Sequence, residues 1–422
     1  MIINGNNLEE LKKFPDNYFH SVVTDPPYGL SFMGKKWDYD VPSVELWTEV
    51  FRVLKPGGYL LSFAGTRTQH RMAVNIEDAG FEIRDMIAWV YGSGFPKSHN
   101  IGKAVDKLQG NERESKIITG KVFTGSNNNI NGEAGQYEVS KGTSEWEGWG
   151  TALKPALEPI TMARKPFKGA VANNVLKNGV GGINIDGCRV ETEENLSSNN
   201  TTKKFMGSNN NRDSDGKRIE YKQNPQGRFP ANFIHDGSDE VKYLFPDTKS
   251  GALKKGDKVS TKHQADHKWG MKGMERVNEY KPDSGSASRF FYCAKASKKD
   301  RNEGLEDFEK KNNDVHNNPN RMFQKSSGIT EMDKSTRKSN QNHHPTVKPT
   351  NLMRYLVRLV TPQNGIVLDC FMGSGSTGKA CALEGFEFVG IDLDKEYCEI
   401  AKARIDKALE YKKQVEAQQE LF

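Results

Sequence analysis

Residues 366–378, which read IVLDCFMGSGSTG, decide the fold of this 422-residue chain. Their first four residues form a short apolar run typical of a buried strand, and the glycine-rich turn leads into a helix that begins at Lys379. A second apolar run, 386–391, ends at Asp392. The pattern predicts a strand–helix–strand unit in which glycines let a ligand approach the backbone and an acidic residue accepts hydrogen bonds from ribose hydroxyls. We therefore expect a ligand that contains a nucleoside.

The glycine spacing fits more than one nucleoside ligand. Gly373, Gly375 and Gly378 match the G-x-G-x-x-G pattern of dinucleotide folds, and the same turn with Lys379 matches a phosphate-binding loop. Such a loop needs Ser or Thr after its lysine to hold Mg²⁺, and this chain has Ala380 there, which argues against an NTPase. A dinucleotide and S-adenosylmethionine both stay open on the glycines alone.

A second informative stretch lies near the N-terminus, where residues 22–29 read VVTDPPYG. Two successive prolines donate no backbone hydrogen bond, so the strand must stop at Asp25. The corner that follows is stiff and presents a carboxylate, proline carbonyls and the ring of Tyr28. These groups suit a planar substrate with an amino group, whose N–H bonds need acceptors and whose face can stack on the ring. A plain turn with a surface tyrosine is the alternative interpretation.

Composition allows two or three domains, or one core with a large insertion. Hydrophobic residues make up 35% of the chain and charged residues 27%. The mean hydropathy of −0.76 indicates that a sizeable part of the chain is solvated loop. The net charge of +6 favours a polyanionic partner.

The cysteines and the apolar runs exclude several classes of protein. Five cysteines without a C-x-x-C pair argue against a disulfide framework and a cysteine zinc site, and we expect no metal. Nowhere do about 18 apolar residues follow one another, so we expect no membrane segment and a soluble, cytoplasmic protein.

Helical and strand patterns alternate over the first 90 residues, which predicts a parallel α/β sheet. The predicted elements are a short helix after Asn7, strands over 19–24, 59–63 and 81–90, and helices over 44–54 and 71–79. A further short strand is predicted over 158–163. Residues 110–150 show neither period, and residues 169–340 are irregular and rich in Asn, Lys and Ser. A loop of that length in a compact domain is functional or disordered.

The two informative stretches complement each other. Both lie at the carboxyl ends of predicted parallel strands, and a doubly wound sheet brings two such ends together at its switch point. They would share one cleft, with a nucleoside cofactor beside a corner that accepts an amino group. Because the chain shows no hydride or phosphoryl machinery, this arrangement favours transfer of a group to an exocyclic nitrogen.

The motifs resemble those of the DNA amino-methyltransferases, specifically the circularly permuted β class. Three elements match in the family's order: D-P-P-Y at 25–28, H-P-x-x-K-P at 344–349 and F-x-G-x-G-x-T at 371–377. Residues 148–155 and 291–295 are also similar to phage and prophage members. Near the N-terminus the family commonly has Gly-Asp, whereas this chain has Gly5-Asn6, so a neutral amide replaces the carboxylate that contacts adenosine.

The resemblance implies a doubly wound, mostly parallel, seven-stranded sheet of the Rossmann-like methyltransferase type. The catalytic domain would comprise 1–168 and 341–422, with a loop insertion at about 101–147, and residues 169–340 would recognise the target. S-adenosylmethionine would be the cofactor. The implied cofactor-binding residues are Asn6, Asp25, His344, Thr346, Lys348, Pro349, Asp369, Phe371, Gly373, Ser374, Gly375, Thr377 and Asp392.

Double-stranded DNA is the expected substrate, and basic residues of the middle region are the candidate contacts because lysine and arginine neutralise phosphates. The candidates are Lys203, Lys204, Arg212, Lys217, Arg218, Lys222 and Arg228. A solvated loop without a recognition role is the alternative interpretation of this stretch. A homodimer and a cognate restriction enzyme stay open as partners.

The catalytic residues implied are Asp25, Pro26, Pro27 and Tyr28. We expect the target base to be flipped out of the duplex and stacked on Tyr28, while Asp25 and the Pro26 carbonyl accept hydrogen bonds from its amino group. In this family Asp before Pro-Pro-Tyr is more usual for adenine N6 than for cytosine N4, so adenine is favoured. Cytosine N4 methylation, RNA or protein N-methylation, and a non-enzymatic DNA-binding module that holds a nucleoside remain the alternatives.

Overall fold

The computed structural model describes residues 1–30, 39–94, 98–121, 134–192, 227–249, 284–294, 299–312 and 339–419. All statements below concern these residues. Within them, no helix combines the length and the apolar character needed to cross a membrane.

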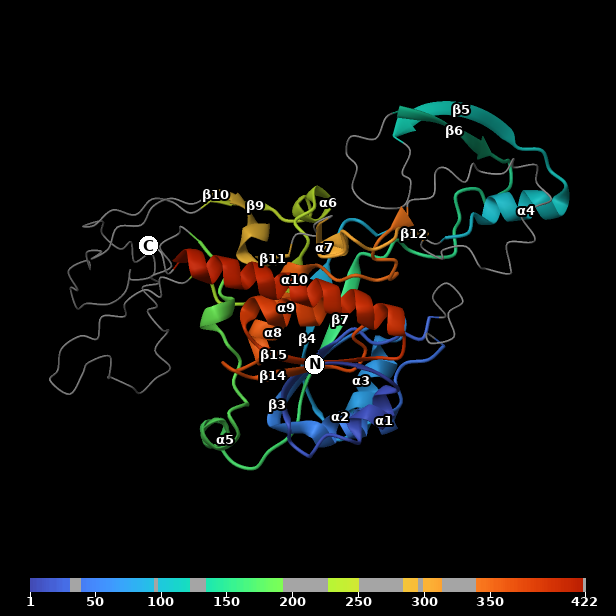
Figure 1. The fold of residues 1–422 in the computed structure, drawn as a ribbon. Coiled ribbons are helices and arrows are strands. Elements are labelled where there is room, and N and C mark those ends of the chain that lie inside the picture. Colours follow the sequence, from blue (N-terminus) through green and yellow to red (C-terminus); the bar gives the residue numbers. More distant parts are fainter. Residues whose placement is uncertain are drawn as a thin grey trace, which may run out of the picture.

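One large, mostly parallel sheet forms the centre of the fold (Figure 1). Its order across the described residues is β1 (Ile2–Asn4), β15 (Glu387–Asp392), β14 (Ile366–Asp369), β2 (Phe19–Thr24), β3 (Leu54–Phe63), β7 (Leu157–Arg164), β4 (Glu82–Val90), β8 (Phe233–His235) and β11 (Tyr292–Cys293). Only β7 runs antiparallel to its neighbours, β3 and β4. The predicted doubly wound α/β fold is confirmed.

The sheet differs from the expected one in its size. It has nine strands in the described part instead of seven, because β8 and β11 of the middle region extend it beyond β4. Strand β7 lies between β3 and β4. Two segments of the predicted recognition region are therefore part of the same sheet as the predicted catalytic corner.

Helices cover both faces of the sheet (Figure 1). On one face lie α1 (Asn7–Leu11), α2 (Val44–Val53) and α3 (Gln69–Asp78), and on the other lie α8 (Thr350–Val360), α9 (Ser376–Glu384) and α10 (Lys395–Gln419). Each layer has its own core, with Trp47 and Met72 in the first and Tyr355 and Leu356 in the second. Burial of each such side chain contributes on the order of 1.5–3 kcal/mol.

Helix α2 shows why these segments are helical. The Ser43 side chain accepts a hydrogen bond from Leu46 N at 3.4 Å and so caps the first turn. Leu46, Trp47, Val50 and Val53 are buried and recur at helical spacing, which gives one apolar face. The helix ends at Val53, one residue before the expected end, because Leu54 already belongs to β3.

The beginning and the end of the chain form neighbouring strands. Ile3 of β1 pairs with Ile391 of β15, and Val22 of β2 pairs with Leu368 of β14, both in parallel register. The strand before the Asp-Pro-Pro-Tyr corner and the strand before the glycine turn are therefore direct neighbours, as a shared cleft requires.

The described residues of 100–150, which are 100–121 and 134–150, form a separate projection (Figure 1). It contains α4 (Ile101–Gln109) and an antiparallel hairpin of β5 (Glu114–Lys121) and β6 (Ala134–Lys141), so the expectation of no regular structure over 110–150 was wrong. The many glycines and asparagines in this stretch of sequence hid the alternation of apolar and polar residues that predicts a strand. Arg113 pairs with both Asp106 and Glu147, the latter at 2.9 Å, and ties α4 to the segment after the hairpin.

The middle region contributes short elements only, within the part that the structure describes. They are α5 (Val171–Asn178), η3 (Asp186–Cys188), α6 (Asp239–Lys242), β9 (Asp247–Lys249), β10 (Ser284–Ser286), η4 (Ala287–Phe290), α7 (Lys299–Asn302), β12 (Lys311–Asn312) and β13 (Ser339–Asn340).

Candidate active site

The corner after β2 forms where the sequence predicted it, just before the two prolines. The strand ends at Thr24, and Asp25 begins the corner with both carboxylate oxygens engaged. Oδ1 accepts a hydrogen bond of 2.7 Å from the Tyr28 hydroxyl, and Oδ2 lies 2.9 Å from Lys348 Nζ. The acidic group therefore has a fixed position at the carboxyl end of a central strand.

A buried carboxylate connects this corner to the glycine turn. Asp369, at the end of β14, accepts hydrogen bonds of 2.6 Å from both Thr24 Oγ1 and Thr377 Oγ1. Burial raises its pKa to about 6, against the lowering effect of the two hydroxyl donors. With 2% of its surface exposed, Asp369 holds two strand ends and the start of α9 together. The contacts that its side chain makes are with the protein's own hydroxyl and backbone donors.

The glycine turn has two residues in the left-handed region, Gly373 at φ +50° and Gly375 at φ +77°. A Cβ on Gly373 would lie 2.7 Å from His344 Nε2, and one on Gly375 would lie 2.9 Å from the Ala401 Cα. Both positions therefore require glycine. The backbone N–H of Gly373 donates to Asp392 Oδ2 at 2.7 Å, so the turn and the acidic end of β15 form one unit.

A buried arginine supports the turn from behind. Arg404 of α10 donates to the carbonyl and, at 3.1 Å, to the hydroxyl oxygen of Ser374. Burial lowers the pKa of Arg404 to about 10. Lys379, which the sequence placed in a phosphate-loop pattern, pairs with Glu303 at 2.7 Å. A lysine held in that way supports the exclusion of a phosphate-binding loop.

The N-terminal turn lies against the same edge. Asn7 Nδ2 donates to the Cys370 carbonyl at 3.1 Å, and Gly5 N donates to the Asp392 carbonyl at 3.0 Å. The side chain of Asn6 accepts hydrogen bonds from the backbone of Leu8 and Glu9 and caps α1. Asn6 therefore stands near the predicted cofactor site, although its side-chain oxygen serves the helix.

Residues 344–349 close the site from the other side. His344 Nδ1 donates to the Thr346 carbonyl at 2.6 Å, and burial lowers the pKa of this imidazole to about 4. The ring is therefore neutral near pH 7 and lies next to Gly373. Pro349 precedes α8, and Lys348 is only 6% exposed.

Sequence reasoning missed Glu158, at the start of β7. Its Oε2 lies 3.0 Å from Lys348 Nζ and accepts a hydrogen bond of 3.1 Å from the Tyr28 hydroxyl. Tyr91, at the end of β4, also bonds to Glu158. A strand that runs antiparallel within a parallel sheet begins at the edge where its neighbours end, and that rule could have identified Glu158 had the place of β7 been known.

The two carboxylates shift the pKa values of the groups that they contact. Burial alone would lower the pKa of Lys348, but the carboxylates of Asp25 and Glu158 raise it above its ordinary value. Burial, followed by the same two carboxylates, raises the pKa of the Tyr28 phenol well above its ordinary value. Lys348 is therefore cationic and Tyr28 neutral at any physiological pH.

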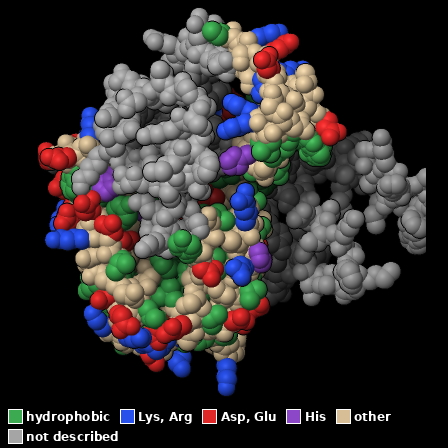
Figure 2. Space-filling view, turned by 90° about the vertical axis from the view of Figure 1, so that its right-hand side faces the viewer, with side chains coloured by type: hydrophobic (Ala, Val, Ile, Leu, Met, Phe, Trp, Pro, Cys, Tyr) green, Lys and Arg blue, Asp and Glu red, His purple; other side chains and the backbone are tan. Residues whose placement is uncertain are grey.

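The predicted DNA contacts are not assembled in the described residues. Lys203, Lys204, Arg212, Lys217, Arg218 and Lys222 lie outside them. Arg228 is described: its backbone pairs with Val190, and its guanidinium lies 4.1 Å from the centre of the Phe290 ring. On the face drawn in Figure 2, positive and negative side chains of the described residues are interspersed.

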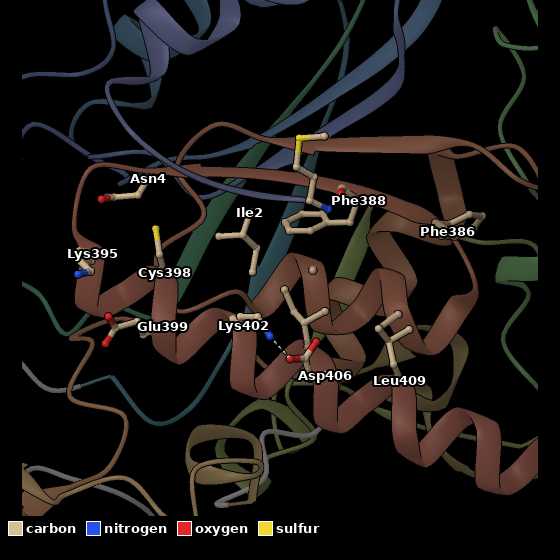
Figure 3. Close-up of a pocket in the computed structure, with 14 residues that line it drawn as sticks. Ile2, Asn4, Phe386, Phe388, Lys395, Cys398, Glu399, Lys402, Asp406 and Leu409 are labelled. Atoms are coloured by element: carbon tan, nitrogen blue, oxygen red, sulfur yellow. Dashed lines mark hydrogen bonds and ion pairs between the residues drawn. The ribbon is translucent and has the colours of Figure 1, made fainter.

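A cavity of about 510 Å³ lies elsewhere, between β1, β15 and α10 (Figure 3). Ile2, Phe388 and Leu409 give it an apolar lining, and Lys402 and Asp406 form an ion pair of 2.7 Å on its α10 side. None of the predicted site residues lines it. In the part of the chain that the structure describes, no three His, Cys, Asp or Glu side chains are grouped so that they could hold a metal ion.

Comparisons with known proteins agree with the motifs. A family model described as DNA methylase, covering N6 and N4 methyltransferases, matches residues 19–403. The Type II methyltransferase M.HindIII of Haemophilus influenzae is 28% identical over 227 residues, which cover 43% of this chain and 64% of that protein. The DNA adenine methyltransferase YhdJ of Escherichia coli is 36% identical over 69 residues, 16% of this chain and 24% of that one.

The chain thus covers less than two thirds of these curated relatives. A crystal structure of M1.HpyAVI in complex with SAM overlaps 96% of this chain and 98% of its own, at 16% identity and a TM-score of 0.36. The fold assignment depends instead on the strand order described above. Because the family model spans most of the sequence, the chain belongs to the DNA methylase family of N6 and N4 methyltransferases.

Proposed function

We propose that this protein transfers the methyl group of S-adenosylmethionine to an exocyclic amino group of double-stranded DNA, at adenine N6. One observation carries the proposal: the Thr24–Asp369 hydrogen bond of 2.6 Å joins the acidic corner to the glycine turn at a single edge of the sheet. An acceptor for an amino group and a turn suited to a nucleoside therefore lie side by side.

S-adenosylmethionine is the cofactor of this family, and the residues present fit it. Gly373 and Gly375 give the turn its left-handed backbone, and Asp392 offers a carboxylate at the end of β15. The neutral ring of His344 adds no positive charge beside a sulfonium. When bound, this cofactor supplies an electrophilic methyl group. Gly373, Gly375 and Asp392 are the residues that would hold its adenosine part.

The corner residues have distinct roles in the proposed reaction. A flipped base, which costs a few kcal/mol to extrude, stacks on the Tyr28 ring. Asp25 and the Pro26 carbonyl accept hydrogen bonds from the amino group, which orients the nitrogen lone pair. The cofactor, held by the glycine turn and Asp392, would supply its methyl group to this nitrogen. The proton that the nitrogen gives up would pass to the Asp25 carboxylate, which accepts its N–H bond.

Two considerations favour adenine over cytosine. Asp25 stands where the family resemblance associates Asp with adenine N6, and one relative is named a DNA adenine methyltransferase. Residues 169–340 are proposed to recognise the target sequence, with 1–168 and 341–422 as the catalytic domain. Strands β8 and β11 connect the two parts, since they extend the catalytic sheet from the middle region.

The test is mass spectrometry of nucleosides from unmethylated double-stranded DNA after incubation with protein and labelled cofactor. N6-methyladenine is expected, and Asp25→Asn should form none. Detection of N4-methylcytosine instead would show that the target base is cytosine. Label in RNA or protein but not in DNA would overturn the DNA assignment, and protection of DNA without any label would indicate a binding module.

A further inference from the structure

We infer that Glu158 is a positioning residue of the methyl transfer, which holds Lys348 and the Tyr28 hydroxyl while Asp25 binds the target amino group. The inference rests on the proposed function and adds a residue to it. Position 158 lies within the part of the chain that the family resemblance covers, but none of the matched motifs includes it and the resemblance assigns it no role.

Glu158 duplicates the contacts of Asp25. Lys348 Nζ lies 2.9 Å from Asp25 Oδ2 and 3.0 Å from Glu158 Oε2. The Tyr28 hydroxyl lies 2.7 Å from Asp25 Oδ1 and 3.1 Å from the same Glu158 oxygen. Each donor that occupies Asp25 therefore has a second acceptor within hydrogen-bond distance.

This duplication matters because the target amino group has to compete for Asp25 with the two donors already bound to it. Both of its oxygens are engaged in the free protein, and an amino group from the base needs at least one of them. Lys348 is 6% exposed, so its ammonium group cannot turn to water when it leaves Asp25. An unpaired buried charge is strongly unfavourable, and Glu158 provides the partner that avoids it.

Charge leads to the same conclusion. Two carboxylates and one ammonium group give the cluster a net negative charge, so one carboxylate can pair with Lys348 while the other serves the substrate. With glutamine at 158, Lys348 would pair with Asp25 alone and compete with the amino group. The loss of one carboxylate would also bring the pKa of Lys348 down toward its ordinary value, because both carboxylates raise it.

Glu158 is itself well placed for this task. It pairs with Trp89 in the β4–β7 ladder, and Tyr91, the residue after β4, bonds to its side chain. Tyr91 N donates to the Ala156 carbonyl at 3.0 Å, which fixes the segment just before β7. The carboxylate therefore projects from a sheet ladder instead of a loop.

The experiment compares Glu158→Gln with a matched control, Glu82→Gln. Glu82 lies at the other end of the same pair of strands and binds Arg164 of β7 at 2.7 Å, away from the site. Single-turnover methylation of DNA is measured from pH 6.5 to 10, together with cofactor affinity by calorimetry. We expect Glu158→Gln to lower the single-turnover rate at pH 7.5 by about 30-fold or more, with cofactor affinity within about threefold.

The pH profile separates positioning from a merely structural role. The rate of Glu158→Gln should rise at alkaline pH as Lys348 loses its proton and frees Asp25, whereas wild type and Glu82→Gln should show no such rise. A second readout needs no catalysis: the pH at which the side-chain NMR signal of Lys348 titrates, in protein with isotope-labelled lysine, should move to lower pH in Glu158→Gln.

Each outcome has a defined meaning. If wild type methylates DNA and Glu158→Gln matches it within twofold, the inference about Glu158 is overturned and the proposed function stands. An equal loss of rate at every pH, with an unshifted Lys348 titration, would also overturn the inference and leave a structural role. If wild type itself methylates no base, the proposed function is overturned and the inference with it.

Discussion

The Thr24 hydroxyl donates a hydrogen bond of 2.6 Å to the carboxylate of Asp369, which lies 345 residues further along the chain. The other oxygen of that carboxylate accepts from Thr377 at the start of α9. Three segments that carry the site thus meet at one buried side chain. Stability and cofactor binding should both depend on it.

Thr24→Val keeps the shape of the side chain and removes its hydroxyl. We expect the free energy of unfolding to fall by about 1–3 kcal/mol, because a buried carboxylate oxygen loses the closer of its two donors and keeps only Phe371 N at 3.2 Å. Denaturant unfolding gives the measurement. Thr48→Val is the control: its hydroxyl donates to the Val44 carbonyl at 2.8 Å on an exposed helix face, so the change should stay within about 0.5 kcal/mol. Equal losses for both variants would contradict the role given to Asp369.

Asp25→Asn should abolish methyl transfer and preserve cofactor affinity. The variant removes the charged acceptor, and Glu158 still neutralises Lys348, so the fold should survive. We expect a loss of about 100-fold or more in single-turnover rate. Calorimetry with S-adenosylmethionine should show a dissociation constant within about threefold of wild type, and a loss of binding would instead assign Asp25 to the cofactor.

Tyr28 should act mainly through its ring. Tyr28→Phe removes the hydroxyl bonds to Asp25 and Glu158 and keeps the stacking face, so we expect a rate loss of about tenfold. Tyr28→Ala should lose about 100-fold or more, since stacking of a base on an aromatic ring contributes on the order of 1–3 kcal/mol. Single-turnover rates on the same DNA separate the two. Equal rates for Phe and Ala would mean that the hydroxyl matters more than the ring.

Gly373→Ala should weaken cofactor binding. Its φ of +50° strains any L-residue, and the new Cβ would lie 2.7 Å from His344 Nε2. We expect the dissociation constant for S-adenosylmethionine to rise about tenfold or more. Gly110→Ala is matched for strain, at φ +69°, with no atom within 4 Å of its new Cβ, so it should bind as wild type does. If Gly110→Ala also bound S-adenosylmethionine more weakly, backbone strain alone would explain the lower affinity of Gly373→Ala.

His344 should make the protein less stable in acid. Burial lowers its pKa from 6.5 to about 4, so between these values the unfolded chain binds a proton that the folded protein does not. Its contribution to stability is complete above about pH 6.5 and is lost as the pH falls toward 4. Asp369, whose pKa is raised to about 6, acts in the opposite direction, so the measurement must isolate the histidine.

The comparison is wild type against His344→Asn, with unfolding free energies at pH 7 and pH 4.5. We expect wild type to lose about 2 kcal/mol more than the variant over this interval. An equal loss for the two proteins would show that other groups determine the acid sensitivity.

Local chemistry explains which parts of the site could be predicted. The prolines at 26 and 27 end β2, and the glycines within 371–378 mark the turn before α9. Both features could therefore be predicted from short motifs. Their adjacency followed from the rule that parallel strands end at one edge. The structural role of Asp369 could not be predicted, because the sequence alone does not distinguish a buried aspartate from one that binds a ligand.

Non-local pairing explains what was missed. Nothing near Glu158 indicates that β7 inserts between β3 and β4, and without that placement the carboxylate has no connection to Lys348. Strands β8 and β11 have three and two residues, too short for a period to appear, which is why nine strands were not expected.

The projection over residues 100–150 leaves and rejoins the molecule at one place, since Asn100 and Gly150 form an antiparallel bridge and Ser98 Oγ accepts from Thr151 N at 2.9 Å. A segment whose two stems touch can be cut out and replaced by a tight turn without moving β4 or β7. We therefore expect that a foreign peptide or a shortened loop can replace the segment between these stems with little strain on β4 and β7.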